Sequence, residues 1–557
     1  MGRKEDNIKR ATEVMHNRER IRNLAIAAHI DHGKTTLSDN LIAGAGMMSE
    51  ELAGKSRVLD FDDQESARGI TINAASASMV HGVDGEDYLI NLIDTPGHVD
   101  FGGDVTRAMR AVDGCIILTC AVEGAMPQTE TVVRQALKEK VRPVLFINKV
   151  DRLINELQVT PEDMMARFQK QIIKVNDLIR KFAPEQHKSN WQVDVAKGTV
   201  AFGSAYHNWG ITVPFMQKTG VNFPEIFEYC NNEQQKELAK KAPVHEVLLD
   251  MAVEKLPSPL VAQEYRIPNI WQGDLDSEVG KTMVNCDADG PLSLMITKIW
   301  MDPHAGEVAV GRVYSGTIKQ GESVWASGAG KAERVQQVSM MVGGDRIQVP
   351  GVSAGNIAAL TGVRSAAAGV TITRDKDETP FEAIRHYSEP VVTVAIEPKS
   401  MKDLPKFIGA LRSLAKSDAS LSVDTNHETG EALLSGMGEL HLEITIYRLE
   451  EEQGIKVNQS NPIVVYRESI GADNKGRPFE GKSPNRHNRF YVEVEQLPEN
   501  VITALREGDL GDGPVRNKDA KEVGNKFGEL GMDKDLMRKI YAINATTVLV
   551  NLSLIHI

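Results

Sequence analysis

The feature that most constrains the fold is a series of four short apolar segments, each running into polar or glycine residues. They read NLAIAAH, YLINLID, CIILTCAVEG and PVLFINKVD, and helix-like stretches separate them between residues 23 and 151. Unbroken apolar runs of this length are typical of strands buried on both faces, and their alternation with helices predicts βαβ units in a mostly parallel sheet. Ligands of such sheets bind at the carboxyl ends of the strands, so we expect a functional site among the residues that follow the runs.

Composition narrows the classes of protein that the chain can represent. Its 557 residues suit roughly three to five domains, and no segment approaches the roughly 18 apolar residues of a membrane span. The charged N-terminus carries neither a secretion signal nor a myristoylation site, and the four cysteines lack CxxC spacing. We therefore expect a cytoplasmic protein with buried free thiols. The net charge of −13 argues against a protein that coats nucleic acid.

The first apolar run leads into AHIDHGKTTL, residues 28–37, which has the pattern of a phosphate-binding loop except at its first position. Gly33 would let backbone N–H groups approach phosphate oxygens, Lys34 would offer a positive charge to them, and Thr35 a hydroxyl to Mg²⁺. Ala28 replaces the first glycine of the pattern, and its methyl group is tolerable if φ stays negative. The competing interpretation is an ordinary strand-to-helix turn.

A second motif, DTPGH at residues 94–98, follows the run YLINLI directly. Asp94 at that strand end would serve Mg²⁺ directly or through a water, and Gly97 would place a backbone N–H on the γ-phosphate.

A third motif, NKVD at residues 148–151, follows the run PVLFI. Asp151 can accept two hydrogen bonds from the N1–H and N2–H₂ edge of guanine, and adenine lacks this pair of donors. Each tetrapeptide alone is a weak signal. The three motifs in this order, each at a strand end, predict a guanine-nucleotide site.

Two smaller elements fit the same site but would be ordinary turns if found alone. Thr71, in RGIT, could bring its hydroxyl to Mg²⁺ when a γ-phosphate is present, and Ser204 and Ala205, in FGSA, could brace the base.

The second half of the chain has a different pattern of apolar and polar residues. From about Gly290, LSLMITKIW, EVAVGRVYSGTIKQGESVWA and NIAALTG alternate apolar and polar residues with turns at Gly306, Gly316 and Gly321, which predicts a β-barrel. From Pro390 the expected order is strand, helix, strand, strand, helix, as in a ferredoxin-like domain. Helices are also expected at 244–256 and after Thr160. The second would have the apolar face Met165, Phe168, Ile172, Val175 and Ile179.

Taken together, these motifs resemble the translational GTPases. The likeness rests on AHIDHGKTT, RGITI, DTPGHVDF, NKVDR and FGSA, while SGMGELHLEI, NPIVVYRE and KSPNRHNRFY are similar to the elongation factor 2 family of ribosomal translocases. The modest stretch between Ala205 and the barrel favours the archaeal type, because the eukaryotic type carries a large helical insertion there. The likeness covers almost the whole chain.

The resemblance implies a multidomain α/β and β protein. Its parts would be a P-loop GTPase domain with a mostly parallel sheet at 1–275, a β-barrel at 276–380, a ferredoxin-like α+β domain at 388–466 and an incomplete α+β domain at 467–557. The implied activity is ribosome-stimulated hydrolysis of GTP to GDP, with Mg²⁺, driving translocation of tRNA and mRNA. The expected partners of this monomer are ribosomal RNA, ribosomal proteins and the tRNA–mRNA complex, with no membrane.

The resemblance also assigns roles to residues. His98 would orient the attacking water, Asp31 would lie close to the phosphates as the second catalytic residue, and Thr35, Thr71 and Asp94 would lie at Mg²⁺. His441 is expected to be structural rather than a metal ligand, and His29 and His32 to offer mainly backbone contacts. The expected nucleotide-binding set is Ala28, His29, Ile30, Asp31, His32, Gly33, Lys34, Thr35, Thr36, Asp94, Thr95, Pro96, Gly97, His98, Asn148, Lys149, Val150, Asp151, Ser204 and Ala205.

One departure from the family concerns the end of the sequence. The family continues through the rest of a fourth domain and a fifth, and the final SLIHI no longer resembles it. We therefore expect GTP binding but compromised translocation. Three alternatives stay open: a bacterial-type translocase, a GTP-binding conformational switch without translocase activity, and an inert fragment. KSPNRHNRF disfavours the first, and the barrel and ferredoxin-like patterns disfavour the second.

Overall fold

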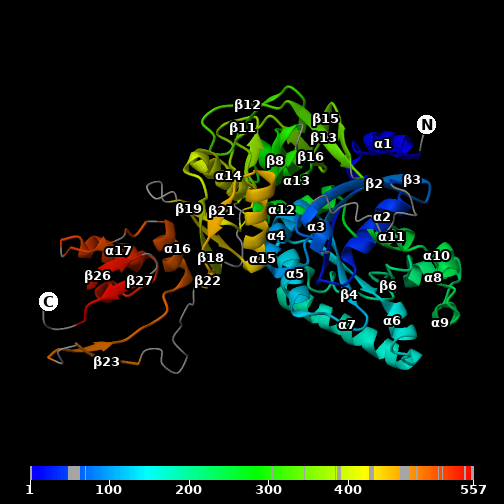
Figure 1. Ribbon diagram of the computed structural model, residues 1–557, viewed down its shortest axis with the longest axis horizontal. Coiled ribbons are helices and arrows are strands. Elements are labelled where there is room, and N and C mark those ends of the chain that lie inside the picture. Colours follow the sequence, from blue (N-terminus) through cyan, green and yellow to red (C-terminus); the bar gives the residue numbers. More distant parts are fainter. Residues whose placement is uncertain are drawn as a thin grey trace. The chain divides into compact units, whose positions relative to one another are not determined.

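The computed structural model describes residues 3–47, 63–68, 71–302, 305–343, 345–382, 384, 390–418, 420–425, 432–464, 477–483, 487–507, 509–511, 513–516, 518–544 and 547–552 (Figure 1). The chain forms two compact units, Met1–Val465 and Tyr466–Ile557. Gly69 and Ile70 of the RGIT motif and the final SLIHI lie outside the described residues.

The larger unit begins with a sheet in the order β2-β3-β1-β4-β5-β6-β7. The pairings β3–β1, β1–β4, β4–β5 and β5–β6 are parallel, and only the outer pairings β2–β3 and β6–β7 are antiparallel. The expectation of a mostly parallel sheet is thus confirmed. Its strands are β1 Ile21–Ala28, β2 Ala75–Val83, β3 Glu86–Asp94, β4 Gly114–Cys120, β5 Arg142–Asn148, β6 Val200–Ser204 and β7 Trp209–Ile211.

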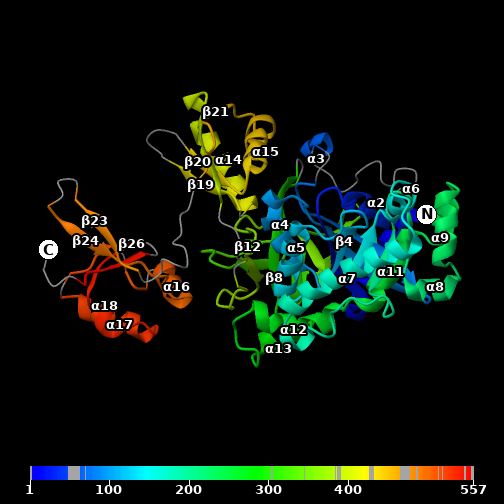
Figure 2. The ribbon, with the colours of Figure 1, turned by 90° about the horizontal axis from the view of Figure 1, so that it is seen from below.

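Helices cover both faces of this sheet, which explains the unbroken apolar runs (Figures 1 and 2). Alternate residues of β1 point to opposite faces. Leu24 and Ile26 pack in the core that contains α2 and α11, whereas Ala25 and Ala27 pack in the core that contains α4, α5 and α7. The helices are α1 Arg3–Val14, α2 Lys34–Gly44, α3 Asp63–Arg68, α4 Gly102–Ala111, α5 Pro127–Lys138, α6 Val150–Asn155, α7 Pro161–Phe182, α8 Val213–Thr219, α9 Phe223–Asn231, α10 Gln235–Lys241, α11 Val244–Lys255, α12 Pro259–Ile270 and α13 Glu278–Val284.

Helix α7 corrects one sequence expectation. Thr160 caps it as expected, its side chain accepting a hydrogen bond from the N–H of Asp163. Met165, however, is 52% exposed, and Met164 is buried in its place. Met164, Phe168 and Val175 fall at steps of four and seven residues on one helix face, and Met165 lies about 100° around the helix from Met164.

Antiparallel strands follow, in the order β12-β11-β17-β8-β9-β16-β13 with β14 beside β13. The turns at Gly306, Gly316 and Gly321 have φ of +75°, +75° and +80°, the left-handed region that glycine enters readily. The strands are β8 Ser293–Asp302, β9 Gly306–Ser315, β10 Thr317–Lys319, β11 Ser323–Ala326, β12 Glu333–Arg334, β13 Gln337–Val342, β14 Asp345–Gln348, β15 Gly351–Ser353, β16 Ile357–Thr361 and β17 Thr371–Thr373.

Residues 392–464 form a third region with its own core of Val394, Ile396, Phe407, Leu411 and Leu434. Its antiparallel sheet has the order β19-β20-β18-β21, and the expected succession of strand, helix, strand, strand, helix is confirmed. The elements are β18 Val392–Pro398, α14 Leu404–Ser417, β19 Ser422–Thr425, β20 Ala432–Gly436, α15 Glu439–Tyr447, β21 Val457–Gln459 and β22 Ile463–Val464.

The smaller unit has a separate core that includes Val501, Phe527 and Ile543. Its elements are β23 Phe479–Lys482, β24 Arg489–Val492, α16 Glu499–Glu507, β25 Gly513–Pro514, α17 Ala520–Glu529, α18 Lys534–Met537, β26 Ile540–Asn544 and β27 Thr547–Val550. Within the described part of the chain, no helix combines the length and apolarity needed to cross a bilayer.

Candidate functional site

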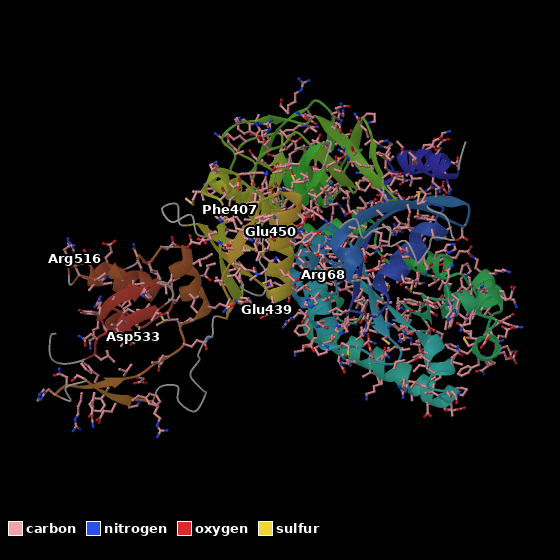
Figure 3. All side chains as sticks on the ribbon, in the orientation of Figure 1. Arg68, Phe407, Glu439, Glu450, Arg516 and Asp533 are labelled. Carbon is pink, nitrogen blue, oxygen red and sulfur yellow. The ribbon has the colours of Figure 1, made fainter. Side chains whose placement is uncertain are left out.

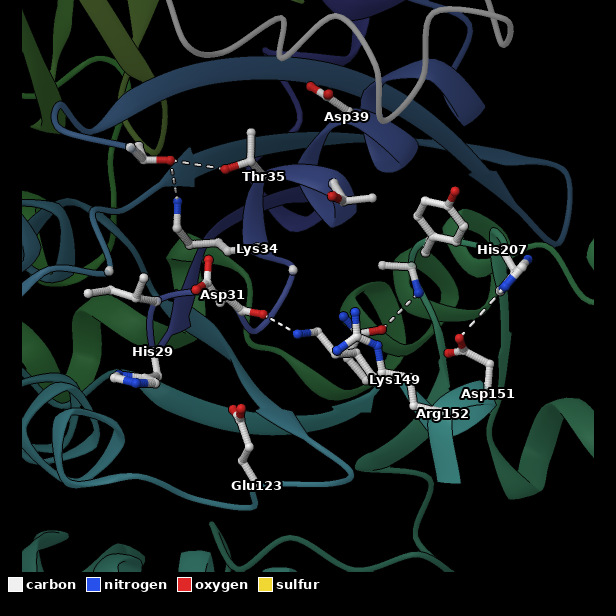
Figure 4. Close-up of a pocket in the computed structure, with 18 of the residues that line it drawn as sticks. His29, Asp31, Lys34, Thr35, Asp39, Glu123, Lys149, Asp151, Arg152 and His207 are labelled. Carbon is white, nitrogen blue, oxygen red and sulfur yellow. Dashed lines mark hydrogen bonds and ion pairs between the residues drawn. The ribbon is translucent and has the colours of Figure 1, made fainter. Parts of the chain in front are cut away.

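A cavity of about 740 Å³ opens at the carboxyl ends of the parallel strands (Figure 4). It lies where the sequence motifs meet, because the loops after β1, β3, β5 and β6 leave the same edge of the sheet. The expected site residues that line it are His29, Ile30, Asp31, Gly33, Lys34, Thr35, Thr36, Thr71, Gly97, His98, Asn148, Lys149, Asp151 and Ala205.

The phosphate-binding loop turns from β1 into α2. Ala28 is buried as the last residue of β1, and it is not among the described residues with positive φ. The backbone there therefore tolerates the alanine methyl group, as the sequence interpretation required. Gly33 precedes α2 with φ of +91°, and a Cβ there would lie 2.5 Å from Nδ2 of Asn148. Only glycine fits this position. Lys34, Thr35 and Thr36 at the start of α2 line the cavity, and the N-terminus of a helix suits an anion.

The groups expected at Mg²⁺ lie together around the Lys34 ammonium. Nζ of Lys34 donates to Oδ2 of Asp94 at 2.9 Å. It also donates to Oγ1 of Thr71 at 3.1 Å, and the hydroxyls of Thr35 and Thr71 are 3.0 Å apart (Figure 4). Oδ1 of Asp94 is buried without a hydrogen-bond partner among the described residues. A buried carboxylate oxygen beside two hydroxyls is a donor set that suits a hard cation, so these residues fit Mg²⁺.

Asn148 links the loop after β1 to the loop after β6. Its Nδ2 donates to the carbonyl of His32 at 2.7 Å, and its Oδ1 accepts from the N–H of Ala205 at 2.8 Å. Nδ2 of Asn40, in α2, donates to the carbonyl of Ala205 at 2.6 Å. Lys149 adds a hydrogen bond from its ammonium to the carbonyl of Asp31 (Figure 4). The NKVD motif thus holds both loops with side-chain hydrogen bonds.

Asp151 lies at the far end of the cavity, in the first turn of α6. Its side chain is 13% exposed, and His207 Nε2 lies 3.7 Å from its Oδ2. Its Oδ1 is buried and accepts no hydrogen bond within the described part of the protein. Because an unsatisfied buried carboxylate oxygen is costly, this atom favours a ligand that brings N–H donors.

His98 lines the opposite part of the cavity with 27% of its side chain exposed. Its Nδ1 accepts a hydrogen bond from the N–H of Asp100 at 3.2 Å, and its ring centroid lies 6.0 Å from that of Phe101.

The structure places the other expected residues behind the cavity wall. Asp94, Thr95 and His32 are buried, and Thr95 Oγ1 donates to the carbonyl of Ile26 at 2.7 Å. Burial lowers the pKa of His32, whose ring contacts the Leu118 carbonyl and Glu123. The rest of this group is Ala28, Pro96, Val150 and Ser204.

Sequence reasoning missed several residues that line the cavity. Glu123 follows β4, and Arg152 follows the NKVD motif directly, so the strand-end rule could have found both. Tyr206 and His207 follow FGSA in the same way. Asp39 and Asn155 lie on helices and Glu156 directly follows one, so they carry no such signal.

Comparisons with known proteins agree with this geometry. Residues 19–258 match the family model of the elongation factor Tu GTP binding domain, 306–373 that of elongation factor Tu domain 2, and 387–461 that of elongation factor G, domain III. Elongation factor 2 of Picrophilus torridus is 61% identical over 99% of this chain and 75% of its own length. Elongation factor 2 of Pyrococcus furiosus is 60% identical over 98% of this chain and 74% of its own length.

The chain belongs to the elongation factor 2 family. A third relative agrees with this assignment. Elongation factor 2 of Thermoplasma acidophilum is 58% identical over 99% of the chain and 74% of its own length. The archaeal resemblance expected from the sequence is thus confirmed, and the chain is a translational GTPase and a translation elongation factor. The chain spans about three quarters of the length of these relatives.

Proposed function

We propose that the cavity binds GTP with Mg²⁺, and that ribosome-stimulated hydrolysis there serves the translocation of tRNA and mRNA. The observation that carries the proposal is a pair of buried carboxylate oxygens without hydrogen-bond partners among the described residues. One is Oδ1 of Asp151 at the far end of the cavity, and the other is Oδ1 of Asp94, which lies behind Lys34 of the cavity wall and pairs with it through Oδ2. They suit a ligand that presents a cation at one end and N–H donors at the other, which a magnesium–guanine nucleotide does.

Each group of site residues would have its own role in nucleotide binding or hydrolysis. Lys34 and the first N–H groups of α2 would hold the β- and γ-phosphates, and Asp151 would select guanine. Thr35, Thr71 and Asp94 would hold Mg²⁺, which would neutralise charge on the phosphate oxygens. His98 would orient the attacking water, and Asp31 would stay beside the phosphates. Phosphoryl transfer depends mainly on positioning and electrostatic stabilisation, so this set requires no covalent catalyst.

The domain division expected from the sequence, at 1–275, 276–380, 388–466 and 467–557, belongs to this proposal. The strand orders of residues 293–373 and 392–464 support a β-barrel and a ferredoxin-like domain respectively. The ribosome, contacted through its RNA and proteins, would be the partner of a monomer.

The test is GTP hydrolysis with and without archaeal ribosomes, for the native chain and for His98→Ala. We expect ribosomes to stimulate the native chain. We expect His98→Ala to bind GTP as tightly but to lose about 10²-fold or more of the stimulated rate. Equal hydrolysis of ATP would contradict the assignment of Asp151, and an unstimulated native chain would favour the GTP-binding switch without ribosomal translocase activity.

A further inference from the structure

The segment that follows the DTPG motif is held by residues of the third region. Phe101 packs in a small buried core with Ile72 and Ile444, the second of which lies on α15. The ring of His441, also on α15, meets the Phe101 ring edge-on with centroids 5.8 Å apart. The Asp100 carboxylate lies against Gly438, where a Cβ would be 2.3 Å from Oδ2. Asp100 and Phe101 are therefore both held in place by residues of the third region.

His441 is itself tightly positioned. Its Nδ1 accepts a hydrogen bond from the N–H of Met437 at 3.1 Å, so the ring proton lies on Nε2, which donates to Oδ2 of Asp418 at 2.8 Å. Burial opposes ionisation of Asp418, but the His441 hydrogen bond and the nearby Arg107 charge outweigh it and lower the pKa of that carboxyl. Arg107, on α4, also donates to the carbonyl of Ser417 at 3.0 Å. The imidazole is thus fixed at both nitrogens.

His98 depends on the two residues that this arrangement fixes. Asp100 donates its N–H to Nδ1 of His98, and Phe101 supports one side of the His98 ring. We propose that His441 is a positioning residue for GTP hydrolysis, which acts on His98 through Phe101. This inference rests on the proposed function, in which His98 orients the attacking water.

Helix α15 and the residue that follows it also contact residues on both sides of Thr71 in the sequence. Glu443 pairs with Arg68 of α3 at 2.8 Å, and Arg448, just after α15, donates to Oδ1 of Asn73 at 3.2 Å. Figure 3 labels Arg68 and also Glu439, the first residue of α15. The same helix therefore supports the groups at both sides of the γ-phosphate position, Thr71 and His98.

The experiment measures ribosome-stimulated GTP hydrolysis by His441→Ala and His441→Gln. The glutamine keeps an N–H donor toward Asp418 and serves if the alanine variant fails to fold. We expect the maximal stimulated rate of either variant to fall about tenfold to a hundredfold. The affinity for a fluorescent GTP analogue and the half-saturating ribosome concentration should stay within twofold of the native values, on the order expected for groups outside the binding site.

The chain offers a matched control in His81, whose Nε2 lies 2.7 Å from Oδ1 of Asp250 in another histidine–aspartate pair. His81→Gln should leave the stimulated rate unchanged. A second test is the double variant of His441→Ala with Phe101→Leu. Because His441 acts through Phe101, the double variant should be no slower than Phe101→Leu alone.

Four outcomes would overturn the inference. A native stimulated rate in both His441 variants would show that His441 does not position His98, while leaving the proposed function intact. Additive losses in the double variant, or a raised half-saturating ribosome concentration at an unchanged maximal rate, would assign His441 another role. A native chain that ribosomes fail to stimulate would overturn the proposed function and this inference together.

Discussion

At the scale of single residues, the site depends on atoms whose partners lie far away in sequence. Asn148 Nδ2 bonds to the carbonyl of His32, 116 positions earlier, and the same nitrogen excludes any side chain at Gly33. Oδ1 of Asp151 accepts no hydrogen bond from the described residues. Asp151 and Gly33 are therefore the residues at which small changes should have specific effects.

The substitution Asp151→Asn should shift nucleotide preference from GTP towards XTP. The asparagine amide offers a donor NH₂ group and an acceptor oxygen in place of two acceptor oxygens. It therefore loses a charge-assisted hydrogen bond from guanine, and its NH₂ group can donate instead to the second carbonyl of xanthine. We expect GTP affinity to fall about tenfold to a hundredfold. Competition between GTP and XTP for the site would measure this. Asp163→Asn, in the first turn of α7, is the matched control and should leave the preference unchanged.

The substitution Gly33→Ala should abolish tight GTP binding. Its Cβ would lie 2.5 Å from Asn148 Nδ2 at a φ of +91°, so the loop must move. Gly85→Ala is a matched control, because Gly85 has φ of +83° with nothing within 4 Å of a Cβ. We expect that control to cost about 1–2 kcal/mol of unfolding free energy and to leave GTP affinity intact. Tight GTP binding by the Gly33 variant would contradict this account of the loop.

At the scale of elements, ionised Asp418 joins the end of α14 to α15 through His441 and lies near Arg107 of α4. Its pKa in the folded protein is lower than in the unfolded chain. A depressed carboxyl pKa stabilises the fold above the unfolded pKa, near 4, and this contribution is lost as pH falls further.

The substitution Asp418→Asn should therefore destabilise the third region at neutral pH by about 1.5–3 kcal/mol, the range for a hydrogen bond to a charged group. The difference between this variant and the native chain should shrink as pH is lowered from about 5 to about 3. Urea unfolding across that pH range would measure both effects. Asp424→Asn, which removes an exposed carboxylate from β19, should show no such pH-dependent difference. A constant difference across the range would contradict the linkage.

At the scale of the larger unit, a buried ionic cluster joins the parallel sheet region to the antiparallel strands. Asp113 Oδ1 pairs with Arg266 of α12 and Oδ2 with Arg312 of β9, each at 2.9 Å, and all three side chains are fully buried. Burial alone would raise the pKa of Asp113, but the two guanidinium groups outweigh it and lower the pKa. Arg312 also donates to the carbonyl of Ala111.

The substitution Asp113→Ala should cost about 3–5 kcal/mol of unfolding free energy, because it leaves buried guanidinium charge uncompensated. Calorimetry and denaturant unfolding would measure this loss. Asp87→Ala provides the control, since Asp87 pairs with Arg10 with about a third of each side chain exposed, and should cost at most about 1 kcal/mol. Equal losses of unfolding free energy in the two variants would show that the Asp113 cluster does not stabilise the junction between the parallel sheet region and the antiparallel strands.

The sequence by itself determined the strands of the parallel sheet and the loops that follow them. Those features are local: apolar runs, glycine turns and motif spacing lie within short windows, and parallel strands must bring their carboxyl ends to one edge. Compatibility of Ala28 with the loop was conditional on a negative φ in the sequence, and the structure decided that sign. The face of α7 was harder to place, because Met164 and Met165 are adjacent and equally apolar.

The tertiary structure alone decided which distant groups meet. Nothing local in the sequence indicates that Asn148 braces His32 and Ala205, that Asp113 joins Arg266 and Arg312, or that His441 contacts Phe101. The physical reason is that such contacts depend on how whole elements pack, and on burial that makes hydrogen bonds and charges count more than they would in water. Most of the residues that line the cavity could be predicted from the sequence, whereas the side-chain contacts that join them to the rest of the larger unit could not.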